Sequence, residues 1–92
     1  MQVTVEYSAQ VKRAAGVATE TFELDDGTTL CQLVSRIAEI RGEALAGTLF
    51  NADGELHPSI LVFVNDVQIL TTENPPLSHD ACVTFLSPIS GG

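Results

Sequence analysis

The sequence predicts an α+β domain in which one face of a mixed five-stranded sheet packs on one main helix. Five short segments are rich in β-branched and other apolar residues, as strands are, and one segment has the apolar spacing of an amphipathic helix. The chain has 92 residues, of which 45% are hydrophobic and 17% charged, and this is enough for one modest hydrophobic core. We therefore expect residues 1–92 to form a single domain.

The first part of the chain predicts two strands joined by a helical turn. Val3, Val5 and Tyr7 alternate with polar residues, as in a half-buried strand, and a similar alternation recurs over residues 18–24. The connection between them is too long for a two-residue hairpin turn. Its alanines favour a short helical turn, which Gly16 can close.

The clearest helix begins after Thr29. Thr29 and Gln32 have the spacing of a capping box, and the apolar residues that follow recur every three or four positions. These residues are Leu30, Leu33, Val34, Ile37 and Ala38. Arg41 suits the C-terminal end of the helix dipole, and Gly42 predicts a left-handed stop. Residues 45–56 are weakly patterned and predict no element.

Three more strands are expected in the C-terminal half. Residues 60–64 form an apolar run, and Asn65-Asp66 introduces residues 67–70 as its hairpin partner. A proline-containing loop leads to the last strand, residues 82–86, and Pro88 then stops ladder pairing because it has no N–H to donate. The order β, β, α, β, β, β, with a last strand that runs into the chain end, favours the β-grasp or ubiquitin-like arrangement.

The chain ends in Gly91-Gly92, shortly after that last strand. Glycine has no Cβ, so the final peptide units can slide into a channel too narrow for side chains. The distinctive chemical group here is the α-carboxylate of Gly92. A carboxylate resists nucleophiles, so chemistry at this group requires activation, and we expect an acyl-adenylate made from ATP. The alternative is an ordinary frayed terminus, although attachment to an apolar strand favours the functional interpretation.

Charge and composition restrict the partners. Twelve acidic residues against four basic ones give a net charge of −8, which disfavours nucleic acid as a partner. The longest apolar run is far shorter than the ~20 residues that span a bilayer, and we see no signal segment, so we expect a cytoplasmic protein without a membrane partner. Cys31 and Cys82 are too few for a disulfide framework, and we expect Cys31 to be a small core residue of the helix. His57 and His79 lack clustered ligands, so no metal site is predicted.

Four stretches resemble the MoaD/ThiS family of small sulfur-carrier proteins. They are residues 7–12 followed by Gly16, residues 27–30 with Leu33, residues 62–65, and residues 83–92. The last is the most specific, because its strand, proline and diglycine match the family's terminal segment in register. The long first connection is most similar to the small subunit of molybdopterin synthase. Asp80-Ala81 and Ser87 depart from the usual pattern, and residues 54–57 also resemble the carrier for cysteine synthesis, so the subfamily stays open.

The resemblance implies a mechanism that matches the terminus. An E1-like enzyme would adenylate the Gly92 carboxylate with ATP, and a persulfide or sulfide source would displace AMP to leave a C-terminal thiocarboxylate. The protein would bind no cofactor and would be a reagent and subunit rather than an enzyme. In the leading version its flexible tail, about residues 87–92, enters a sulfur-accepting synthase subunit in molybdopterin synthesis. The alternatives are a carrier for cysteine or thiamin thiazole synthesis, and a ubiquitin-like modifier joined through Gly92 to other proteins.

The last expectation concerns a surface for those partners. Residues 60–64 are apolar on both sides, and we assign the β-branched side to the helix because it resembles the inward positions of the family. The expected inward residues of the two strands are Ile60, Val62, Val64, Val83 and Phe85. If the strands are neighbours, Leu61, Phe63 and Leu86 form one exposed apolar patch, the outer patch, and such a patch usually marks an interaction site. The alternative is that residues 42–58 cover it. The predicted partner-binding residues are Leu61, Phe63, Leu86, Pro88, Ile89 and Ser90, with Gly91 giving access to the reactive Gly92.

Overall fold

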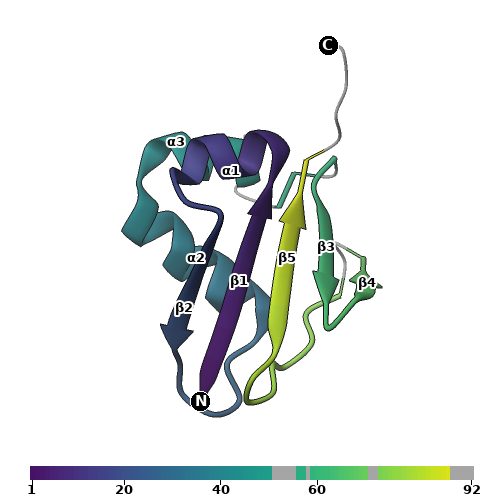
Figure 1. Ribbon diagram of the computed structural model, residues 1–92. Coiled ribbons are helices and arrows are strands. Elements are labelled where there is room, and N and C mark those ends of the chain that lie inside the picture. Colours follow the sequence, from purple (N-terminus) through teal and green to yellow (C-terminus); the bar gives the residue numbers. More distant parts are fainter. Residues whose placement is uncertain (51–55, 58, 71–72, 88–92) are drawn as a thin grey trace.

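The computed structural model describes residues 1–50, 56–57, 59–70 and 73–87. The strands within these ranges are β1 (Gln2–Ser8), β2 (Thr19–Glu23), β3 (Leu61–Val64), β4 (Val67–Ile69) and β5 (Cys82–Leu86). The helices are α1 (Ala9–Ala15), α2 (Leu30–Arg41) and α3 (Glu43–Leu49). The strands form one sheet in the order β2-β1-β5-β3-β4, and the helices cover one of its faces (Figure 1). The predicted α+β class and mixed five-stranded sheet are confirmed.

The first and last strands lie side by side in the middle of the sheet. β1 and β5 are parallel, whereas β2, β3 and β4 are each antiparallel to their neighbours. In Figure 1 the β1 and β5 arrows point the same way, towards the end of the sheet where the main chain leaves β5. The parallel register sets Val5 beside Val83 and Tyr7 beside Phe85. Because side chains alternate along a strand, all four residues face the helices, and each has at most 3% of its surface exposed.

Helix α2 begins as the sequence predicts. Thr29 Oγ1 accepts a hydrogen bond from the Gln32 N–H at 3.4 Å, and Gln32 Oε1 accepts one from the Thr29 N–H at 2.9 Å. Helix α2 ends before Gly42, as predicted, but Gly42 does not adopt the predicted left-handed helical conformation. Gly42 has φ 83° and ψ −168°, which is outside the left-handed helical region, because the chain turns here directly into α3.

Two local expectations were wrong. The weakly patterned segment contains α3, in which Leu45 and Leu49 are fully buried and which packs against α1 and α2. The apolar pattern of α3 is weak because the helix is short, contains Gly47, and has only two buried apolar residues, Leu45 and Leu49. Cys31, expected in the core, is exposed. It sits at the rim of the apolar stripe of α2 rather than on it.

The remaining turns agree with their sequences. Asn65 and Asp66, which join β3 to β4, have φ values of 51° and 68°, as the expected hairpin requires. Gly16 ends α1 with φ 80°, so the predicted helical turn is present and extends over Ala9–Ala15. Within the described ranges no helix is long and apolar enough to cross a membrane.

Candidate functional site

The candidate site is the end of β5, from which the chain continues to the diglycine. Five of the predicted site residues lie outside the described residues: Pro88, Ile89, Ser90, Gly91 and Gly92. What the structure describes is the point from which they extend. Ser87, with which the expected tail begins, is 3% exposed, and its Oγ accepts a hydrogen bond from the Gln10 N–H at 2.9 Å.

This bond links the end of the sheet to the first turn of α1. β1 runs directly into α1 through Ala9, which has a φ of 57°, and Gln10 follows within the helix. The Gln10 N–H is one of the first-turn donors that a helix leaves without an internal partner. Ser87 therefore fixes the outgoing chain to the top of β1 and satisfies a helix end at the same time. Sequence reasoning missed this role, because the two residues are 77 positions apart.

The outer patch lies on the sheet face opposite the helices. Leu61 of β3 is directly across from Leu86 of β5, and Phe63 is across from Thr84. All three patch residues are partly exposed, whereas Val83 and Phe85 on the other face are fully buried. The expected orientation of both strands is therefore confirmed. The patch ends at Leu86, immediately before Ser87.

The described part of residues 42–58 does not cover this patch. α3 lies on the helix side of the sheet, and Phe50 and Leu56, which form an isolated bridge, pack against the buried core. Residues 51–55 and 58 are outside the described residues.

The rest of the same sheet face is polar. Thr4 and Glu6 of β1 and Thr19 and Thr21 of β2 occupy it beside the outer patch. Cys82 lies between the two regions, and burial together with the nearby Glu6 carboxylate raises the pKa of its thiol. The thiol form is therefore favoured at neutral pH, which argues against Cys82 as a nucleophile acting on the tail.

A polar network closes the helix side of the fold. The Tyr7 hydroxyl donates to Glu20 Oε2 at 2.5 Å, and Arg41 donates to both Glu20 oxygens, from Nε at 3.0 Å and from Nη2 at 2.5 Å. Burial alone raises the pKa of Glu20, but the hydrogen bonds from Arg41 and Tyr7 outweigh it, so its pKa is lowered. Burial and the Glu20 carboxylate raise the pKa of Tyr7. These groups connect β1, β2 and the end of α2, so the network is structural.

This arrangement defines a class of protein. Parallel first and last strands in the centre of a mixed sheet, with the main helix across one face, make the β-grasp or ubiquitin-like fold. SAMP1 from Haloferax volcanii has the same fold, with a TM-score of 0.88 and 23% identity over 100% of both chains. A putative molybdopterin converting factor subunit 1 from Pyrococcus furiosus gives a TM-score of 0.74 and 24% identity, over 97% of this chain and 99% of that one.

A third similar structure is a complex of subunits 1 and 2 of the molybdopterin-converting factor from Helicobacter pylori 26695. Its TM-score is 0.64 at 22% identity, over 100% of both chains. At these identities the likeness shows the fold. No match was found among curated protein sequences.

The family is shown by sequence. The model of the ThiS family matches residues 5–92, from the first strand to the final glycine. The chain therefore belongs to the ThiS family of ubiquitin-like sulfur carriers, as its terminal strand, proline and diglycine predicted.

Proposed function

We infer that the protein is a sulfur carrier whose Gly92 carboxylate becomes a thiocarboxylate that supplies sulfur in molybdopterin synthesis. The observation that carries the proposal is that the family match extends through the diglycine to Gly92. Similarity to a converting-factor subunit 1, and to a complex of subunits 1 and 2, supports the pathway. The protein then acts as a co-substrate and subunit, not as a catalyst.

The chemistry takes place in the partner proteins. In an E1-like enzyme, a Gly92 carboxylate oxygen attacks the α-phosphorus of ATP and pyrophosphate leaves. Sulfide then attacks the acyl carbon of the adenylate, and the C–O bond to AMP breaks to give the thiocarboxylate. The absence of side chains at Gly91 and Gly92 lets this group reach a buried reaction centre.

The described residues contribute placement. Ser87 is held by Gln10, so the tail starts from a fixed point at the end of β5. The outer patch of Leu61, Phe63 and Leu86 adjoins that point and gives a partner an apolar surface to cover. The net charge of −8 favours approach to basic partner surfaces.

The direct test is an intact-mass measurement. The protein is incubated with ATP, a cognate activating enzyme and sulfide, and we expect one oxygen-to-sulfur exchange at the last residue. Deletion of Gly92 should abolish the exchange. Gly47→Ala is the matched control, because Gly47 lies in α3 with open space around it and should react normally. The activating enzyme is shown to be active by its reaction with a second carrier protein that it is known to modify. An unchanged mass of the present protein under the same conditions would refute the proposal.

A second candidate is a protein modifier, which the likeness to SAMP1, a small archaeal modifier protein, favours. Both functions begin with the same adenylate and differ in the nucleophile, which is sulfide in one and a lysine amine in the other. The same reaction mixture therefore separates them when sulfide is replaced by a lysine-rich acceptor protein. An adduct whose mass is that of the two proteins together less one water, and which survives reducing agent, identifies the modifier.

A further inference from the structure

Strand β2 forms one edge of the sheet. The Leu24 N–H donates to the Met1 carbonyl at 2.8 Å, and the Tyr7 N–H donates to the Ala18 carbonyl, also at 2.8 Å. In an antiparallel pair such bonds fall on every second residue. The backbone N–H and C=O groups of Thr19, Thr21 and Glu23 therefore point away from β1, towards the free edge. An edge of this kind can pair with another strand.

A groove of about 680 Å³ lies between α2 and the end of this edge strand, which contributes Glu23 to its lining. Figure 1 shows the two elements next to each other, with α2 behind the edge strand. Leu24 and residues 25–28 line one end of the groove, and α2 lines its length with Cys31, Ser35 and Glu39. Gln32 and Arg36 also line this stretch, and the small side chains of Cys31 and Ser35 leave room beside them for a side chain from an added strand.

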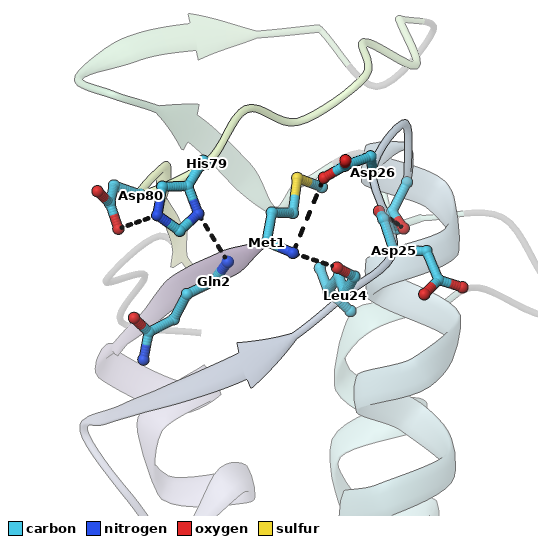
Figure 2. A network of polar contacts seen from close by, with 8 residues as sticks. Met1, Gln2, Leu24, Asp25, Asp26, His79 and Asp80 are labelled. Carbon is cyan, nitrogen blue, oxygen red and sulfur yellow. Dashed lines mark hydrogen bonds and ion pairs between the residues drawn. The ribbon is translucent and has the colours of Figure 1, made fainter.

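The charge of the groove indicates which kind of ligand it can bind. Its lining includes the carboxylates Glu23, Asp25, Asp26 and Glu39, against the single guanidinium of Arg36. Figure 2 shows that the Met1 ammonium approaches Asp26, at 3.9 Å, while it donates to the Leu24 carbonyl. Among the described residues, no ion pair engages Glu23, Asp25 or Glu39. The groove is therefore suited to a chain that carries positive charge.

We propose that the β2–α2 groove is a docking site for an extended basic peptide of a partner protein, which pairs with Thr19, Thr21 and Glu23 as a sixth strand antiparallel to β2. This is β-strand addition to a sheet edge, in which main-chain hydrogen bonds give affinity and alternate side chains give specificity. The proposal does not depend on the sulfur chemistry, because it uses no residue of the tail.

The dimensions fix the peptide pattern. Cys31 and Glu39 are eight residues apart, about 12 Å along a helix that rises ~1.5 Å per residue. Residues i and i+4 of a strand point to the same side and lie about 13 Å apart. Two basic residues four positions apart can then reach Glu39 and the loop of Asp25 and Asp26. An aliphatic residue midway between them lies beside Ser35, which is midway between Cys31 and Glu39.

The Glu23 end of the groove and the end of β5 lie at opposite ends of the sheet. Glu23 pairs with Gln2 at the start of β1, whereas Leu86 pairs with Ser8 at its end. A partner can therefore hold the groove while the diglycine occupies a reaction centre.

The test uses the full-length protein and a blocked peptide, Gly-Lys-Thr-Val-Thr-Lys-Gly. Titration followed by ¹⁵N-labelled amide spectra should give saturable shifts that are largest at Thr19, Thr21 and Glu23. Glu39→Lys should weaken binding by about tenfold or more, whereas Glu6→Lys, the same charge change on the other face, should weaken it by less than about twofold. A thermal melt shows whether the charge reversal Glu39→Lys destabilises the fold. If it does, Glu39→Gln, which removes the charge without reversing it, takes its place in the binding measurement.

Two altered peptides separate strand addition from charge attraction. N-methylation of the two threonine amides removes the paired donors without changing charge and should abolish saturable binding. A peptide of the same composition with adjacent lysines should bind at least about tenfold more weakly. Equal binding of both lysine arrangements, shifts spread over the whole acidic surface, or shifts centred on the outer patch would each overturn the proposal.

Discussion

The two phenylalanines of β3 and β5 test which face of the sheet is the core. Phe85 is fully buried and its ring stacks on that of Tyr7, with centroids 6.2 Å apart. Phe63 is partly exposed on the opposite face, where its cross-strand neighbours are Gln68 and Thr84. Phe85→Ala should therefore cost about 3–5 kcal/mol of unfolding free energy, because it leaves a cavity. Phe63→Ala opens no core cavity and should cost about 1 kcal/mol or less.

Phe63→Ala, which costs the fold less than Phe85→Ala, should have the larger effect on the affinity for partner proteins. If the outer patch is the partner surface, Phe63→Ala should weaken binding to the activating enzyme or the acceptor subunit by about 2 kcal/mol, the scale of an interface hot spot. That loss is about 30-fold in Kd. Thr4→Ala is the control, because Thr4 lies on the same face but belongs to β1, outside the patch and outside the proposed docking edge of β2.

Urea unfolding and calorimetric titration measure the two quantities. A loss of ~3–5 kcal/mol in the unfolding free energy of Phe63→Ala would make it a core residue and would refute the assigned sidedness. A stable Phe63→Ala protein with unchanged affinity for both partners would show that the patch is not their interface.

Three further variants probe the tail, its anchor and the polar network. Gly91→Ala should slow adenylation strongly while the melting temperature stays unchanged, and a thermal loss as large as the kinetic one would contradict a tail role. Ser87→Ala leaves the Gln10 N–H without its acceptor and should cost about 1–2 kcal/mol in urea unfolding. Glu20 has a lowered folded pKa, so its stabilisation is complete above its ordinary value of 4.5 and is lost as pH falls through the folded pKa. The stability difference between wild type and Glu20→Gln should therefore shrink on acidification below pH 4.5, and a difference that is constant with pH would refute the Arg41 pairing.

Local patterns predicted most of the fold because they act through near neighbours. The capping box at Thr29, the alternation in β1 and the turn at Asn65-Asp66 each depend on residues a few positions apart. The same period of two divided β3 into two faces, but the inward face was chosen because its β-branched residues resemble the inward positions of the family. Helix α3 escaped prediction because its stability comes from packing against α1 and α2, not from its own pattern.

The parts of the site that sequence could not supply depend on long-range contacts. The Ser87 bond to Gln10 joins residues from opposite ends of the chain, and no local pattern announces it. Arg41 was assigned to the helix dipole, whereas it also pairs with Glu20 on a strand that comes before the helix. The proposed docking site likewise needed the sheet order, which shows that β2 is an edge strand.

The closeness of the outer patch to the start of the tail has a kinetic consequence. Leu86 belongs to the patch and Ser87 follows it, fixed by its bond to Gln10. A partner that covers the patch thus holds the carboxylate near its reaction centre, and tail entry becomes an intramolecular step with an effective concentration on the order of mM. Phe63→Ala weakens the hold without touching the reacting group, so KM should rise while kcat stays close to wild type. Gly91→Ala changes the segment next to the reacting group, so it should lower kcat. Steady-state adenylation assays with the carrier as the varied substrate measure both constants, and an equal fall in kcat for the two variants would show that the patch and the tail do not act as separate steps.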